Sequence, residues 1–293
     1  PSCPAAMSAK KAAKRKMKRI RVLLILILFS GIIPVTGQTG IGDTQLTLED
    51  LYKRITETKD ENEKIRLNDS ITFLIGSYAA SDSVFIHRFE NLRWLGQIVS
   101  PDMKLKILTW NVFMRNSPNR YFCYFIRKGE KKQKNTVNYL TGQNREEPIR
   151  TDITYNADNW YGALYYAIQP FRKNRQTYYI LLGLDYGNIK LSRKMIEVLN
   201  FTPEGGILFG LDCFEKENEN GLRYVLEYSP EGIVSLRVEN AKMIVFDSLT
   251  KVTTGHGDGS ELSGAGITFD AYVLKRGTWK FISDVDVKNK KTD

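Results

Sequence analysis

The chain has 293 residues, and its 43 Lys and Arg exceed its 33 Asp and Glu by a formal net charge of +10. Eight of the basic residues and none of the acidic ones lie in residues 1–37, so the remainder carries 35 basic and 33 acidic residues. Nucleic-acid binding requires a concentrated basic surface, and a remainder at +2 argues against it. We therefore expect no nucleic-acid partner.

The N-terminal basic residues precede a short apolar run, Val22–Phe29, which continues after Ser30 and Gly31 only through Ile32 and Ile33. A basic segment followed by a short apolar segment is typical of a secretory signal. The run is shorter than the roughly 20 apolar residues that a membrane-spanning helix needs. An exported protein, periplasmic or extracellular, is therefore predicted, and an uncleaved anchor is the alternative.

The signal region is predicted to cover residues 1–37. Met17 is a suitable natural start, and the small residue Gly37, with Val35 two positions before it, suits a cleavage point. Once the signal is removed, we expect a protein that is not integral to the membrane. The 256 residues after Gly37 suffice for one large domain, or for a domain with a small helical addition.

A helical segment is predicted over residues 38–83. Apolar residues recur at helical spacing from Thr47 to Ile55 and again from Asp60 to Ala79. Asp60 stands where an N-terminal cap of the second helix is expected. These two helices should form an antiparallel pair that packs on a β-rich domain over residues 84–289, with a tail at residues 290–293.

From residue 84 onward the apolar pattern is that of short strands. Val84–Phe89, Trp94–Val99, Leu105–Val112 and Tyr121–Ile126 are rich in aromatic and β-branched residues and are separated by turn residues. Residues 128–150 are charged and rich in asparagine, which predicts a long exposed connection.

The centre of the chain is its most apolar part. Tyr161–Ile168 and Thr177–Leu184 are almost continuously apolar, which predicts strands that are buried on both faces. Leu191–Leu199 places apolar residues at helical spacing and predicts one inserted helix. Six further strands are expected at Ile207–Phe214, Leu222–Tyr228, Val234–Val238, Met243–Phe246, Ile267–Leu274 and Trp279–Val285. The pattern predicts an α+β fold, with a mainly antiparallel β body, an N-terminal helical pair and one inserted helix.

Few residues in the sequence suit catalysis or metal binding. The chain has two histidines, His87 and His256, and no Cys/His pair has the spacing of a zinc site. We expect no metal and no cofactor, and the sequence favours a non-enzymatic protein without deciding the point. Cys123 and Cys213 both lie in apolar runs, and either a disulfide or two buried thiols is consistent with the sequence.

Several segments occur in a recognisable order between about residues 84 and 289. They are Ser100-Pro101-Asp102 with Leu105–Asn111, Trp160–Tyr166, Tyr178–Asp185, Lys194–Leu199, Met243–Asp247, Phe269–Tyr272, Trp279 and Asp284–Asp286. In this order they resemble segments of a group of uncharacterised exported Gram-negative bacterial proteins. The resemblance implies export. It assigns no activity and no functional residues.

Candidate ligand-binding residues are predicted where the apolar centre reaches the surface and where carboxylates flank strands. They are Trp160, Asp185, Asp247, His256, Asp258 and Asp270. The function we expect is that of an exported, non-enzymatic envelope-associated or binding protein, whose partner, an envelope component or a glycan, the sequence leaves open. The alternative is a hydrolase of an extracellular polymer that uses paired Asp residues, as glycosidases do.

Export makes a testable prediction. If the signal is cleaved after Gly37, N-terminal sequencing of the protein from its native source should begin at Gln38. A mature protein that still carried Met17 would contradict the cleaved signal.

Overall fold

The computed structural model of the protein describes residues 40–130, 133–143, 148–187, 191–217, 219–253 and 261–287. The predicted signal region, residues 1–37, lies outside these residues. Contacts between Cα atoms divide the chain into two units, residues 1–43 and Thr44–Asp293, and the second unit contains all of the sheets. Among the described residues, no helix is both long and apolar enough to cross a membrane.

Within the described residues, two helices and one 3-10 turn precede the sheets. They are α2 (Ile41–Glu57), α3 (Glu61–Ala79) and η1 (Asp82–Phe85). Asp60 caps α3 as predicted, since its carboxylate accepts a hydrogen bond of 2.9 Å from the backbone N–H of Asn62. The first helix begins at Ile41, six residues before the predicted start at Thr47.

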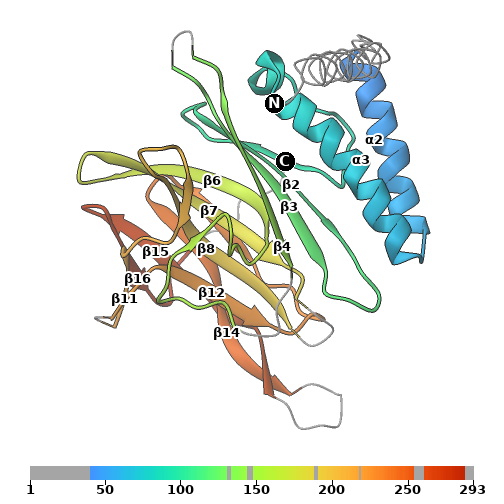
Figure 1. Ribbon diagram of the computed structural model, residues 1–293. Coiled ribbons are helices and arrows are strands. Elements are labelled where there is room, and N and C mark those ends of the chain that lie inside the picture. The colour runs from blue at the N-terminus through green and yellow to red at the C-terminus, as the bar shows by residue number, and fades with distance from the viewer. Residues whose placement is uncertain are drawn as a thin grey trace, which may run out of the picture. The chain divides into compact units, whose positions relative to one another are not determined.

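The strands form three sheets (Figure 1). The first sheet has the order β1 (Gly96–Val99), β2 (Leu105–Val112), β3 (Arg120–Arg127) and β4 (Thr136–Gln143). The middle sheet has the order β5 (Tyr155–Asn156), β9 (Ile207–Phe209), β8 (Ser192–Phe201), β7 (Gln176–Asp185) and β6 (Leu164–Lys173), and β12 (Arg223–Tyr228) also pairs with β8.

The third sheet has the order β11 (Glu219–Gly221), β10 (Phe214–Lys216), β16 (Thr278–Ile282), β15 (Glu261–Lys275), β14 (Met243–Thr253) and β13 (Leu236–Asn240). Strand pairing is antiparallel in all three sheets, apart from the parallel pair β10–β16 within the described chain. The predicted α+β fold with a mainly antiparallel β body and an N-terminal helical pair is therefore confirmed.

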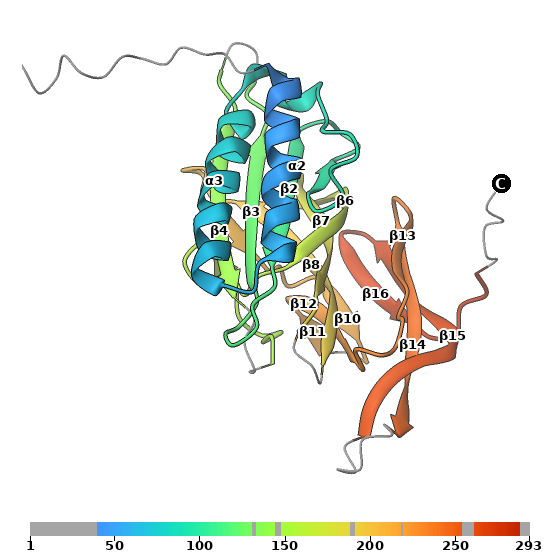
Figure 2. The same cartoon turned by 90° about the vertical axis from the view of Figure 1, so that its right-hand side faces the viewer.

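The layers are packed through three hydrophobic cores. The first core joins α2 and α3 to one face of the first sheet, and Figure 2 shows the two helices lying across β2, β3 and β4. The second core joins the opposite face of the first sheet to the middle sheet, and the third joins the middle sheet to the third sheet. Successive side chains of a strand point to opposite faces, so the long strands β2, β3, β6, β7 and β8 each supply two cores.

Strand β7 shows this double burial most clearly. Tyr179 and Leu181 belong to the second core, while Tyr178, Ile180 and Leu182 belong to the third. The prediction that Thr177–Leu184 is a strand buried on both faces is therefore confirmed.

The predicted inserted helix at Leu191–Leu199 is wrong, because these residues belong to β8. Met195 and Leu199 enter the second core, and Ile196 and Val198 enter the third. A strand that is covered on both faces loses the alternation of apolar and polar residues, and its apolar run cannot be told from a buried helix by periodicity alone.

Two other predicted segments also differ. Residues 128–150 were expected to form a connection but contain β4, an edge strand whose mostly part-exposed residues give it a polar sequence. Val84–Phe89 was expected to be a strand but begins within η1. The carbonyls of Val84 and His87 accept hydrogen bonds from the buried Lys106 ammonium, at 2.6 and 2.8 Å, instead of from a neighbouring strand.

The two cysteines of the sheets are unpaired and lie in different layers. Cys123 is part of the second core and Cys213 is part of the third, with side chains 0% and 1% exposed. Burial raises the pKa of the Cys213 thiol to about 12 and also raises the pKa of Cys123. Both thiols therefore stay uncharged and out of contact with solvent.

This arrangement makes alkylation a direct test of the fold. Native protein should resist iodoacetamide, because the thiolate is the reactive form and neither sulfur is accessible. After denaturation without reductant, mass spectrometry should show both Cys123 and Cys213 alkylated. Labelling that appeared only after reduction would show that the two residues form a disulfide.

Candidate ligand pocket

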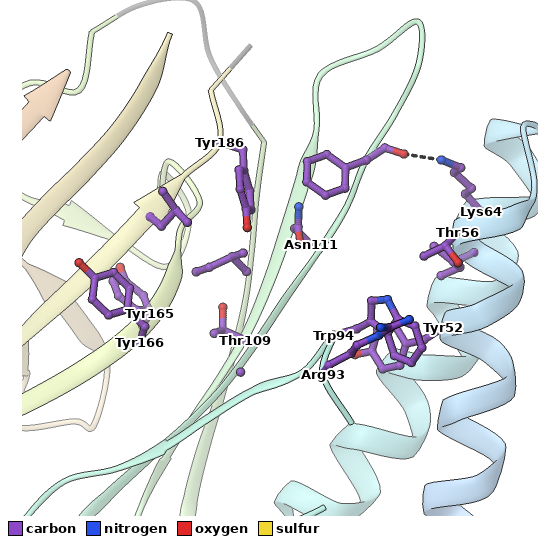
Figure 3. A pocket seen from close by; sticks show the side chains of 15 residues that line it. Tyr52, Thr56, Lys64, Arg93, Trp94, Thr109, Asn111, Tyr165, Tyr166 and Tyr186 are labelled. Carbon is purple, nitrogen blue, oxygen red and sulfur yellow. Dashed lines mark hydrogen bonds between the residues drawn. The ribbon is translucent and has the colours of Figure 1, made fainter. Parts of the chain in front are cut away.

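A cavity of about 520 Å³ lies between the helices and the sheets. One wall comes from α2 and α3 and from the segment after η1, and the other comes from β2, β6 and the end of β7 (Figure 3). Gly96 and Thr109 pack closely where they line the cavity. A side chain at position 96 would not fit, because its Cβ would lie 2.7 Å from the Thr109 methyl group. The Thr109 hydroxyl donates to the Ala163 carbonyl at 3.1 Å, which ties the first sheet to the middle sheet here.

Aromatic side chains dominate the lining. They are Tyr52, Trp94, Phe113, Tyr165, Tyr166 and Tyr186. Three of them are unusually accessible, with Phe113 50%, Tyr186 43% and Tyr166 39% exposed. The rings of Phe113 and Tyr186 are in contact, with centroids 5.3 Å apart. Exposed aromatic groups that gather around one cavity indicate a binding surface.

Two polar groups at the cavity have no hydrogen-bond partner in the described part of the chain. They are the Tyr52 hydroxyl and the Asn111 side-chain nitrogen, and both atoms are buried. Tyr52 is 2% exposed, and burial raises the pKa of its hydroxyl well above the usual value. Buried polar atoms in folded proteins are nearly always hydrogen-bonded, so these two donors are exceptions within the wall of the cavity.

The charged side chains of the lining are both cationic. Lys64 of α3 donates to the Phe113 carbonyl at 2.6 Å, and the Arg93 guanidinium lies 4.6 Å from the centroid of the Trp94 ring. No carboxylate is among the described residues that line the cavity. The charged groups among the described lining residues are therefore all positive.

Residues that do not line the cavity hold its walls in position. Trp110 is fully buried, and its indole N–H donates to the Asn68 carbonyl oxygen on α3 at 2.8 Å. This bond crosses from the first sheet to the helical pair. The two walls are thus fixed to each other before any ligand binds.

A separate buried ionic network lies within the middle sheet. Glu197 of β8 and Arg223 of β12 are directly paired in register, and their side chains are 0% exposed and form a 2.8 Å ion pair. The Tyr161 hydroxyl donates to the second oxygen of Glu197. Arg223 also donates to the carbonyls of Arg150, Ile153 and Phe209. Since these charges have partners on all sides, the network fastens residues 150–161 to the sheet rather than presenting groups to a ligand.

The predicted residues Trp160 and Asp185 lie beside the cavity without lining it. The Trp160 indole N–H donates to the Tyr165 hydroxyl at 3.0 Å, and Tyr165 does line it. Asp185 is 3% exposed, accepts from the Tyr121 hydroxyl at 2.7 Å and forms an ion pair with Arg193 at 3.3 Å. Asp185 and Arg193 line a separate and smaller cavity of about 200 Å³.

The other predicted residues are elsewhere. Asp247 accepts from the Ser235 backbone N–H at 2.7 Å and Asp270 accepts from the Asp284 backbone N–H at 3.2 Å. In the β14–β15 register Asp247 pairs with Phe269 and Asp270 pairs with Phe246, so the two aspartates point to opposite faces. His256 and Asp258 lie outside the described residues. Among the residues described, no group of three His, Cys, Asp or Glu side chains could hold a metal ion.

Sequence reasoning missed most of the cavity lining. Tyr52, Lys64, Arg93, Asn111 and Phe113 come from segments that are distant in the sequence, and none forms part of a motif. The available signal was an aromatic residue directly after a strand, as with Phe113 after β2 and Tyr186 after β7. A residue in that position lies beyond the paired part of the strand, so no neighbouring strand covers its side chain.

Comparison with protein-family models, with curated proteins and with solved structures gave no match.

The buried Glu197 predicts a specific dependence of stability on pH. Burial raises its pKa from 4.5 to about 7, against the opposing effect of Arg223. The folded state therefore binds more protons than the unfolded state between these values, and the free energy of unfolding falls as pH rises through that range. The difference between the two pKa values corresponds to a change of about 3 kcal/mol in the free energy of unfolding.

Urea unfolding at pH 4.5 to 8 measures this effect. In Glu197→Gln the decrease should be absent, because the amide does not titrate in this range. Glu215→Gln, which removes a part-exposed ion pair with Lys280, should keep the decrease of the parent protein. If the free energy of unfolding decreased equally with pH in Glu197→Gln and in the parent protein, the raised pKa of Glu197 would be contradicted.

Proposed function

We propose that the protein is an exported, non-enzymatic binding protein that holds a small molecule with an apolar or aromatic body in the cavity between helices and sheets. The observation that carries the proposal is the gathering of Phe113, Tyr166 and Tyr186, all part-exposed, around one cavity of about 520 Å³. Ligand sites in proteins are mostly apolar, have volumes of roughly 300–1,000 Å³ and contain a few polar groups that orient the ligand. This cavity has each of these properties.

Export, with a place in the periplasm or outside the cell, is supported by the N-terminal sequence. A basic segment precedes a short apolar run, and the order of the later segments resembles that of exported Gram-negative bacterial proteins. A ligand from the cell envelope, or a glycan fragment, is within reach of a protein in that location.

Binding is favoured over hydrolysis by the kind of groups that meet at the cavity. Its described lining is aromatic, aliphatic, cationic or amide in character, which supplies contact and orientation. The hydrolase alternative requires two carboxylates that face one substrate. Asp247 and Asp270 point to opposite faces of the third sheet, so these two do not form such a pair.

Binding of the neutral fluorescent probe N-phenyl-1-naphthylamine tests the proposal. The parent protein should show a saturable fluorescence increase with one site per chain. Phe113→Ser and Tyr186→Ser should each weaken binding by about tenfold, since each removes an aromatic contact worth roughly 1.4 kcal/mol. Both side chains are part-exposed, and their loss should leave the fold intact.

Phe73→Ser provides the matched control. Phe73 is 73% exposed on α3 and does not line the cavity, so its loss removes surface aromatic area without changing the site. It should bind the probe as the parent protein does. Equal weakening in all three variants, or no saturable binding by the parent protein, would refute the proposed site.

A further inference from the structure

Lys64 lines the cavity and has an ammonium group with hydrogen-bond donors left over. An ammonium group has three donors, and that of Lys64 donates one hydrogen bond, to the Phe113 carbonyl at 2.6 Å. It forms no ion pair within 4.0 Å in the described chain. Figure 3 shows its side chain reaching from the helix across the upper part of the cavity toward that carbonyl.

Arg93 brings a second cation that is already oriented. Its guanidinium lies over the Trp94 ring at 4.6 Å from the centroid, and the Trp94 ring itself stacks on Tyr52 at 5.8 Å. A stacked guanidinium keeps its N–H groups available at its edges. In the described residues no carboxylate forms an ion pair with it. The stack holds the side chain in place, which lowers the entropy cost of contacting a ligand.

The carboxylates near this region are occupied by other partners. Glu61 accepts from the backbone N–H groups of Arg115 and Asn116, at 2.7 and 2.6 Å, and these bonds lower its pKa. Glu63 pairs with Arg54 and Arg66. Among the described residues neither Lys64 nor Arg93 has a carboxylate within 4.0 Å, although the Glu61 charge acts on Lys64 at longer range, whereas the buried Arg193 and Arg223 each pair with a carboxylate.

The unsatisfied groups of the cavity have the same polarity. The Tyr52 hydroxyl and the Asn111 amide nitrogen can both donate, and neither has an acceptor in the described chain. An ionised carboxylate is purely an acceptor and takes up to about four hydrogen bonds. The two cations of the lining thus favour an anionic acceptor, while the aromatic walls favour an apolar body.

Building on the proposed function, we infer that the ligand is an organic anion, a small aromatic carboxylate, whose acidic group is attracted by the positive charges of Lys64 and Arg93 and whose ring lies among Phe113, Tyr166 and Tyr186. Charge-assisted hydrogen bonds are shorter and stronger than neutral ones. The cavity therefore binds this class in preference to neutral or cationic molecules of the same shape.

Three probes that share one ring system test the charge preference. They are 2-naphthoate, 2-naphthylmethanol and 2-naphthylmethylammonium, with each dissociation constant measured by displacement of N-phenyl-1-naphthylamine. The anion should bind about tenfold more tightly than the alcohol, and the cation most weakly. Raising the salt concentration should weaken the binding of 2-naphthoate and leave the binding of 2-naphthylmethanol unchanged.

Two variants test whether Lys64 and Arg93 cause the preference for the anion. Lys64→Gln and Arg93→Gln should each weaken 2-naphthoate binding by about fivefold or more and leave 2-naphthylmethanol within about twofold. Lys53→Gln is the control, since Lys53 is an exposed lysine on α2 that contacts Glu57 and does not line the cavity. It should leave all three dissociation constants unchanged.

The outcomes separate this inference from the proposed function. Equal affinity for the anion and the alcohol, or unchanged 2-naphthoate binding in both cavity variants, would overturn the anion preference while the cavity stays a binding site. Failure of all three probes to displace bound N-phenyl-1-naphthylamine would overturn it as well. Failure of N-phenyl-1-naphthylamine itself to bind the parent protein would overturn the proposed function first.

Discussion

The double covering of the middle sheet is the constraint on which the rest of the structure depends. Its strands β7 and β8 supply two hydrophobic cores at once, so any polar group within them must be paired inside the protein. Glu197 meets this requirement through Arg223 and Tyr161, and Arg223 in turn fixes the carbonyls of residues 150 and 153. This network holds the chain that leads into β6, one wall of the cavity.

The cavity exists because two layers meet only in part. The helical pair is fixed to the first sheet by apolar packing and by the Trp110–Asn68 hydrogen bond, and the first sheet is fixed to the middle sheet through Thr109 and Ala163. Between these attachments, aromatic side chains from β6 and from the residues directly after β2 and β7 remain part-exposed. A rigid frame around an incompletely covered aromatic surface favours binding, because little conformational entropy is lost when a ligand enters.

Local physics accounts for the parts of the fold that could be predicted from the sequence. The helix beginning after Asp60 has its own cap and a one-sided apolar pattern, and neither depends on the other layers. Strand β7 was recognisable because a short, continuously apolar run between turns suits a doubly buried strand. Strand β8 has the same burial but a run that also fits helical spacing, and only its pairing with β7, β9 and β12 decides its conformation.

The sequence by itself determined the helical pair, the β-rich class and the apolar centre, because each is encoded by neighbouring residues, and the export signal stays a prediction from the same kind of local pattern. It also pointed to the surroundings of Trp160 and Asp185, which adjoin the cavity. Only the tertiary structure decided which side chains line that cavity. Lys64, Arg93 and Asn111 meet there through the packing of a helix, a loop and a strand, and side chains that fold together from distant segments leave no periodic pattern in the sequence. The position of the two cations that define the proposed ligand is likewise a property of that packing.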